Sequence, residues 1–303
     1  MEKNNIRLLL QDDEQFPYLL REITDAPFGL YLKGSLVFSP PLVAIVGTRR
    51  ATNEGLRLSQ KFGRELAEQN ITVISGLALG IDQAAHRGAL EAQTARNESG
   101  RTTCGEQGRT IAVLANGLDD IYPHQNRPLG EKIIAQGGAL ISEYPLGTPS
   151  LPHQFLERNR IVSGLSLATL VIEAPFESGA LVTAHCAVEQ NRDVFVVPGP
   201  LTNRNYVGSH QLIKSGAALV TNTEDICLAL NLPLLPARSQ TKNLINLTFE
   251  QKMVLNYIET AGHSLPVDKI IELTKLESHV INQALASLVI NDIIKEYNGK
   301  YSL

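Results

Sequence analysis

Apolar residues in this chain gather in short runs that alternate with helix-length segments of mixed polarity. The first clear run, Leu42–Val46, ends at Gly47-Thr48-Arg49-Arg50 and precedes a stretch, Asn53–Gln69, with apolar positions at helical spacing. Similar runs lie at 71–74, 110–114, 139–142, 168–172 and 194–197, and a helical stretch lies at 81–92. Because these runs lack strict alternation, they suit strands buried on both faces of a parallel sheet. The pattern predicts a doubly wound, Rossmann-like α/β domain.

The segments around this pattern set the predicted domain boundaries. Phe16–Leu20 and Pro27–Leu32 are typical of an ordered lead-in that packs on the sheet, so residues 1–232 are expected to form one domain. Residues 93–109 are polar without an apolar period, which predicts a surface insertion. Residues 233–247 combine prolines with polar and basic residues, which predicts an extended linker.

Residues 248–303 predict a second, smaller domain. Thr248 is a helix cap, Pro266 begins a short second helix, and residues 278–289 form a third. An Asn-Gly pair at 298–299 predicts a terminal hairpin, so the segment is interpreted as a winged helix. Its third helical segment, 277–291, contains no Lys or Arg, and we therefore expect a protein contact or a weak accessory role rather than duplex recognition.

Composition excludes several classes of protein. The 303 residues are 43% hydrophobic and contain no apolar run long enough to cross a bilayer, so we expect no membrane association and a cytoplasmic location. Cys104, Cys186 and Cys227 lack metal-ligand spacing and predict neither disulfides nor a zinc site. The net charge of -4 argues against a uniformly basic nucleic-acid binder, although a local patch can still bind.

Glycine, hydroxyl and arginine residues follow several of the apolar runs. They lie at Gly47-Thr48-Arg49, Ser75-Gly76, Asn116-Gly117 and Ser178-Gly179. The carboxyl ends of parallel strands meet at one edge of a sheet, so these loops are expected to share a crevice. Arg158-Asn159-Arg160 is interpreted as a turn whose two guanidinium groups lead into small and hydroxyl residues, which predicts a phosphate-binding site. The alternative for this segment is a helix start with two surface arginines.

No cofactor, metal or catalytic motif is found. The Gly47 loop is neither G-x-G-x-x-G nor a P-loop, yet the helix that follows it offers an N-terminus for a phosphate. We expect Arg49 rather than Arg50 to be the ligand, because it is nearer the strand end. Asp82 and His86 lie four residues apart, but a structural role is favoured because no nucleophile accompanies them. The sequence predicts no enzyme activity.

The motifs together resemble the DprA/Smf family. They are the segments 43–49, 75–78, 80–82, 85–86, 117–119, 122–123, 126, 142–143, 158–161 and 178–181. The resemblance covers about residues 16–228 and implies an extended Rossmann-like fold. It also implies single-stranded DNA binding, homodimers and no catalysis. The expected role is to protect incoming DNA and help load RecA in natural transformation and homologous recombination.

Carried over by position, the resemblance places DNA binding at Gly47, Thr48, Arg49, Ser75, Gly76, Arg158, Asn159, Arg160, Ser178 and Gly179. It places the dimer interface at His210, Gln211, Leu212 and Ile213. Relatives often have a basic residue where this chain has Glu177, so one phosphate contact is expected to be missing. Since only 5% of residues are aromatic, phosphate and arginine contacts are expected to outweigh stacking.

Two other functions remain open at this point. One is a nucleotide-processing enzyme of the related phosphoribohydrolase superfamily, whose loop supplies a catalytic glutamate. The matching loop here, 178–186, has no glutamate after its threonine, so the machinery for that hydrolysis is missing. The other is a small-nucleotide sensor, which would bind mononucleotides in competition with oligonucleotides.

Overall fold

The structure is a computed structural model that describes residues 6–34, 41–94, 110–235, 247–261, 264–290, 293–297 and 299–302. Contacts divide the chain into two units, Met1–Leu234 and Leu235–Leu303. Each unit has its own hydrophobic core.

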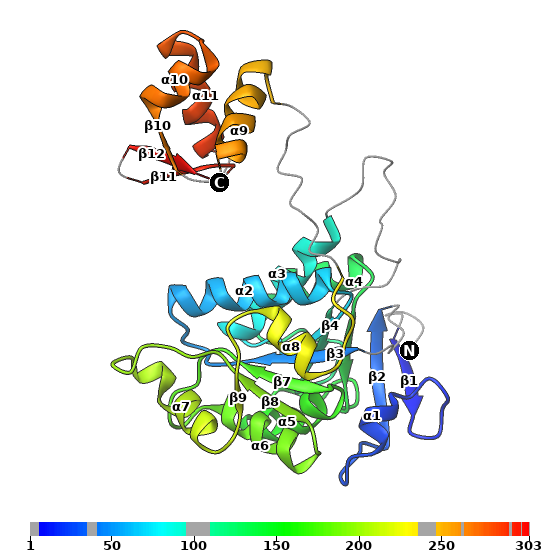
Figure 1. The fold of residues 1–303 in the computed structure, drawn as a ribbon. Helices are drawn as coiled ribbons and strands as arrows, with labels where there is room; N and C mark the ends of the chain where they lie inside the picture. The colour runs from blue at the N-terminus through cyan, green and yellow to red at the C-terminus, as the bar shows by residue number, and fades with distance from the viewer. Residues whose placement is uncertain are drawn as a thin grey trace. The chain divides into compact units, whose positions relative to one another are not determined.

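A nine-stranded sheet forms the centre of the first unit (Figure 1). Its strands are β1 (Ile6–Leu10), β2 (Gly29–Gly34), β3 (Leu42–Val46), β4 (Thr72–Ser75), β5 (Thr110–Val113), β6 (Ala139–Ser142), β7 (Ala168–Val171), β8 (Asp193–Val196) and β9 (Ala218–Leu219). Their order across the sheet is β1-β2-β6-β5-β4-β3-β7-β8-β9. Every pair among β3 to β9 is parallel, whereas β2 joins β6 and β1 joins β2 in antiparallel. The predicted mostly parallel, doubly wound sheet is confirmed.

The strand order contains one switch point that matters for function. From β3 the chain builds outward through β4, β5 and β6, and it then returns to place β7 on the other side of β3. The loops after β3 and β7 therefore leave the sheet toward opposite faces, which opens a crevice beyond the carboxyl ends of these strands.

Helices cover both faces of the sheet (Figure 1). One face carries α2 (Asn53–Glu68), α3 (Ile81–Thr94), α4 (Arg127–Ala135) and α8 (Thr223–Ala229). The other carries α1 (Tyr18–Arg21), α5 (Pro152–Gly164), α6 (Gly179–Glu189) and α7 (Val207–Lys214). Short 3-10 helices, η2 (His124–Asn126) and η3 (Arg204–Tyr206), lead into α4 and α7.

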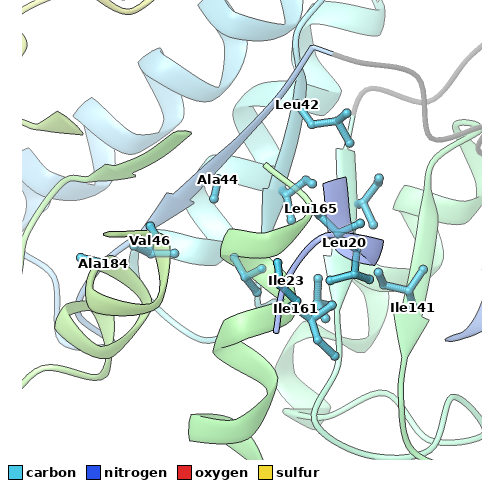
Figure 2. Packing of buried hydrophobic residues seen from close by; sticks show 14 of the residues in the cluster. Leu20, Ile23, Leu42, Ala44, Val46, Ile141, Ile161, Leu165 and Ala184 are labelled. Carbon is cyan, nitrogen blue, oxygen red and sulfur yellow. The ribbon is translucent and has the colours of Figure 1, made fainter. Parts of the chain in front are cut away.

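Strand β3 shows why the apolar runs lack alternation. Val43 and Ile45 pack under α2 and α3, while Ala44 and Val46 pack on the opposite face, and all four are buried. Both faces of this strand thus need apolar side chains. Figure 2 shows the second of these faces, where residues of β3, β6, α1, α5 and α6 meet in one cluster.

The N-terminal lead-in joins the sheet itself. Leu20 and Ile23 pack against Ile161 and Leu165 (Figure 2), and β1 and β2 extend the sheet beyond β6. Of the predicted insertion 93–109, Gln93 and Thr94 end α3, and residues 95–109 lie outside the described residues. Residues 236–246 of the predicted linker also lie outside them.

The second unit contains α9 (Phe249–Ala261), β10 (Leu265–Pro266), α10 (Val267–Thr274), α11 (Ser278–Ile290), β11 (Lys295–Tyr297) and β12 (Lys300–Ser302). The strands form a small antiparallel sheet in the order β10-β12-β11. Thr248 caps α9, because its hydroxyl accepts from the Gln251 N–H at 3.3 Å. Asn298 of the predicted turn lies outside the described residues. The assignment to winged-helix domains stays a prediction.

Candidate functional site

A cavity of about 340 Å³ opens where β3 and β7 end, at the switch point of the sheet. Its lining comes from the loop after β3, the loop after β4, one face of α5, and the loop between β7 and α6. Eight of the ten residues predicted to bind DNA line it: Gly47, Thr48, Arg49, Gly76, Arg158, Asn159, Ser178 and Gly179. The structure therefore brings most of the predicted residues together, while their role toward DNA stays a prediction.

Arg49 offers a guanidinium group at this cavity. Its side chain is exposed, and its guanidinium carbon lies 4.8 Å from the ring centroid of Phe155 on α5. Among the described residues it forms no ion pair. A cation that rests on an aromatic face keeps its charge available for an anion. Arg50 is also exposed and lines the cavity, and the preference for Arg49 as ligand stays a prediction.

Arg158 has a different environment. Its side chain is only 4% exposed, and its Nη1 donates to the carbonyl oxygens of Gly76, at 2.8 Å, and Val113. Burial lowers the pKa of Arg158 to about 10, with Asp82 opposing this effect and Arg49 adding to it. The guanidinium is therefore still charged at neutral pH, but it joins the ends of β4 and β5 rather than reaching outward.

The prediction that residues 158–160 form a turn is wrong, because they lie within α5. The small residues that suggested a turn serve packing and local hydrogen bonds instead. A side chain at Gly164 would press on Leu20 and Ile23, and the Ser163 hydroxyl donates to carbonyls one turn back in the helix. Small residues in a helix thus permit close approach of a neighbouring segment.

Gly76 is held between Arg158 and Asp82. The Gly76 carbonyl accepts from Arg158, while the Gly76 N–H donates to Asp82 Oδ2 at 3.1 Å. The same carboxylate oxygen accepts from the Ala78 N–H at 3.4 Å. Burial raises the pKa of Asp82, and the Arg158 charge opposes that rise. A Cβ at position 76 would collide with the Arg158 guanidinium, so this contact requires glycine.

The N-terminus of α6 opens into the same cavity. Ser178 caps it, since its hydroxyl accepts from the Ala180 N–H at 3.2 Å, and Asn159 Nδ2 donates to the Gly179 carbonyl at 3.2 Å. A Cβ built at Gly179 would meet nothing within 4 Å, so the space before this helix is open. The helix dipole favours an anion there. Glu177 also lines the cavity and is exposed, and it places a negative charge at the rim.

The prediction of a phosphate at the N-terminus of α2 is wrong, because a carboxylate of the chain fills that position. Glu173, fully buried after β7, accepts from the Thr52 N–H at 3.0 Å and from the Thr52 hydroxyl. Asn205 Nδ2 donates to the same carboxylate at 3.2 Å. The positive end of the helix dipole favours a carboxylate at this position. An external phosphate is therefore better placed at α6.

Two of the ten residues predicted to bind DNA, Ser75 and Arg160, do not line the cavity. Ser75 is fully buried, and its hydroxyl donates to the Ile45 carbonyl at 2.6 Å. Arg160 Nη2 donates to both oxygens of Glu143 at 2.7 Å, and its Nε lies 3.2 Å from Asp25 Oδ2. Side chains two positions apart in a helix differ in direction by roughly 200° around the helix axis. Arg158 and Arg160 therefore lie on opposite faces of α5.

The loop at Asn116-Gly117 does not join the predicted crevice. Asn116 is buried, and its Nδ2 donates to the carbonyls of Gly117 and Asp120 at 3.0 and 2.8 Å. The Gly117 N–H donates to the Thr148 carbonyl at 3.0 Å, which ties this loop to the segment after β6. Its polar groups thus hold the loop itself together.

Asp82 and His86 make separate contacts, as expected for structural residues. His86 Nδ1 lies 2.6 Å from the Thr110 hydroxyl oxygen, and that hydroxyl donates to the Val73 carbonyl. His86 Nδ1 must therefore be the donor to Thr110. Burial lowers the pKa of His86 to about 3, so the ring is neutral at physiological pH.

Helix α7 carries the residues predicted for a dimer interface, and they differ in exposure. Leu212 is buried and packs into the core of its own unit. His210 Nε2 lies 3.1 Å from the Gly199 carbonyl, and Ile213 is half-buried. Gln211 is exposed. The homodimer stays a prediction.

Sequence reasoning missed Phe155 and Leu156, which both line the cavity. The signal was present as helical spacing, because Phe155, Arg158 and Val162 fall on one face of a helix. It was overlooked because the segment was interpreted as a turn.

Neither a cluster of metal ligands nor a membrane-spanning helix occurs among the described residues. Within the described ranges, no three His, Cys, Asp or Glu side chains lie together as metal ligands would. No helix in the described part of the chain has the length and apolar content needed to span a bilayer.

Comparison with known proteins gives consistent matches. The family model for DNA recombination-mediator protein A matches residues 7–231. Protein Smf of Escherichia coli K12 is 43% identical over 227 residues, which cover 75% of this chain and 57% of that protein. DprA of Streptococcus pneumoniae R6 is 39% identical over 215 residues, which cover 71% of each. The chain spans less than two thirds of the Smf proteins of E. coli and Synechocystis.

Two solved structures are similar in fold. The X-ray structure of S. pneumoniae DprA aligns with a TM-score of 0.65 and 36% identity, covering 77% of each chain. A Helicobacter pylori DprA structure, described for its single-stranded DNA binding mode, aligns with a TM-score of 0.63 and 30% identity. It covers 75% of this chain and 95% of that one.

Proposed function

Since the chain belongs to the DNA recombination-mediator protein A family, we propose that it binds single-stranded DNA and catalyses no reaction. The observation that carries this proposal is the cavity at the switch point. There the exposed Arg49 guanidinium and the N-terminus of α6 face one space. Both favour a phosphate, and Phe155 supplies an aromatic face beside them.

The size of the cavity favours a single strand over a duplex. At about 340 Å³ it is near the lower end of the range for small-ligand sites, ~300–1,000 Å³. A short piece of a flexible strand can enter such a space, whereas stacked and paired bases cannot unstack without a cost in free energy. The H. pylori relative described for single-stranded DNA binding supports this choice.

The lining also argues against catalysis. The carboxylates that line it are Asp82, which accepts from two backbone N–H groups, and Glu177, which is exposed. Thr183 lines the cavity on α6, and no carboxylate follows it at the spacing that hydrolysis of a nucleotide requires. The proposed absence of catalysis is tested by incubating the protein with purine monophosphates and measuring release of the free base. Turnover would favour the phosphoribohydrolase function instead.

The finer part of the proposal concerns partners. From the family we propose that two copies associate through a surface that includes α7, and that the protein protects incoming DNA and helps load RecA in the cytoplasm. Natural transformation and homologous recombination are the processes in which this would occur. A dimer would present two cavities to one strand and so raise its avidity.

Arg49→Ala tests the central claim. Fluorescence titration of an unstructured oligonucleotide at several salt concentrations should show weaker binding, and the log-log salt slope should become shallower by about 0.7 for each lost phosphate contact. Arg57→Ala is the control, because Arg57 lies on α2 outside the cavity with a side chain 78% exposed. An unchanged curve for Arg49→Ala would remove this residue from the site, and competition by mononucleotides would favour a nucleotide sensor.

A further inference from the structure

A row of aromatic side chains continues from the cavity onto the neighbouring surface. Phe155 lines the cavity under Arg49, and its ring centroid lies 6.0 Å from that of Tyr122. The Tyr122 centroid lies 5.7 Å from that of His124. Tyr122 and His124 are not part of the cavity lining and belong to the segment between β5 and α4.

The outer two members of this row are open to solvent. Tyr122 is 37% exposed, and the His124 side chain is 67% exposed. The ring planes are tilted by 56° between Tyr122 and Phe155 and by 75° between Tyr122 and His124. An edge-to-face contact covers only part of each ring, so the exposed parts of Tyr122 and His124 are accessible to a flat group from solvent.

The segment that carries the two rings is anchored at the cavity rim. Asn126 is buried, and its Nδ2 donates to the carbonyls of Leu77 and Ala78 at 2.8 and 3.2 Å. Ala78 lines the cavity, so the loop after β4 joins the cavity directly to this segment. Rings held on a fixed backbone lose little freedom when they bind a partner.

The acidic groups nearby are already engaged. Asp120 Oδ1 lies 2.5 Å from Arg127 Nη2 and 3.7 Å from His124 Nδ1. Asp119 Oδ1 accepts from the Gly147 N–H at 2.8 Å. Repulsion of a polyanion along this path is therefore reduced.

We infer that Tyr122 and His124 form an outer base-stacking subsite for nucleotides next to the one held in the cavity. This inference rests on the proposed function. The ligand is a single-stranded nucleic acid with unpaired bases, because stacking accepts any base face and needs no particular sequence. The strand would leave the N-terminus of α6, cross Phe155 and continue over the segment before α4.

The test compares Tyr122→Leu with wild type, using fluorescence anisotropy of an oligothymidylate of about 20 nucleotides. Loss of one stacked base should weaken binding roughly 5- to 100-fold, with the salt slope unchanged because no charge is removed. Tyr18→Leu is the matched control, since Tyr18 is 69% exposed on α1 and does not line the cavity. A probe with abasic sites should bind wild type and Tyr122→Leu equally.

The outcomes separate this inference from the proposed function. If Arg49→Ala weakens binding while Tyr122→Leu binds as wild type does, the outer subsite is wrong, and the proposal that the cavity binds DNA is retained. If wild type fails to bind the oligonucleotide, the proposed function fails first. Should Tyr122→Leu lower the unfolding temperature, His124→Ala replaces it as the variant, because His124 is largely exposed. Equal weakening on abasic and normal probes would also overturn stacking.

Discussion

Replacement of Arg158 by methionine should destabilise the first unit strongly. The variant keeps an unbranched, apolar stem in the buried position but leaves the carbonyls of Gly76 and Val113 without their donor. It also removes the positive charge that lowers the pKa of Asp82. Breaking a buried, hydrogen-bonded charge arrangement of this kind costs about 3–5 kcal/mol.

The destabilisation should depend on pH through Asp82. Because burial raises the pKa of Asp82, the folded state holds its proton more readily than the unfolded state. Without Arg158 that pKa rises further, so the ionised carboxylate becomes costlier at high pH and protonation relieves the cost at low pH. The stability difference between wild type and Arg158→Met should therefore be largest above the pKa of Asp82 and shrink as the pH falls.

Urea unfolding of the full chain, followed by circular dichroism, measures both effects. With a slope of about 2–3 kcal/mol/M, the midpoint should fall by roughly 1–2 M at neutral pH. Arg57→Met is the control, since an exposed arginine in a surface pair contributes at most about 1 kcal/mol. A midpoint equal to that of wild type would refute the structural role of Arg158. A difference that does not change with pH would refute its coupling to Asp82.

Three further predictions concern ionisable side chains. Glu177→Lys should tighten oligonucleotide binding and steepen the log-log salt slope by about 0.7, and an unchanged slope in the titration would place this residue outside the phosphate path. Glu173→Gln should lower the urea midpoint, with a loss of about 1–3 kcal/mol in stability, because an NH2 group replaces one of the two carboxylate oxygens that accept from Thr52. An equal midpoint would contradict this. Wild type should lose stability as the pH falls from about 6.5 toward 3, by up to about 1.4 kcal/mol per pH unit, because only the unfolded His86 takes up a proton there. His86→Gln should lose less over that range in urea unfolding, and parallel pH curves for the two proteins would contradict the assignment.

Local sequence patterns were sufficient to predict these helices and strands and most of the loops that line the cavity. Leu42–Val46 was predicted as a strand and is β3, and the helix predicted from Asn53 begins at that residue as α2. Ser178-Gly179 precedes α6 as a capped helix start. These features depend on neighbours in the chain, since apolar period and capping residues act within a few positions. The order of the strands then brought their loops to one edge.

The sequence by itself determined the doubly wound sheet, the glycine and hydroxyl loops at its strand ends, and the helices between them. Only the tertiary structure decided what each charged group does. Glu173 reaches Thr52 across 121 positions of the chain, and Arg160 pairs with Asp25 rather than joining Arg158 at the cavity. The physical reason is that periodicity records which face of an element is buried, whereas the partner of a buried charge is set by whichever distant segment packs against it.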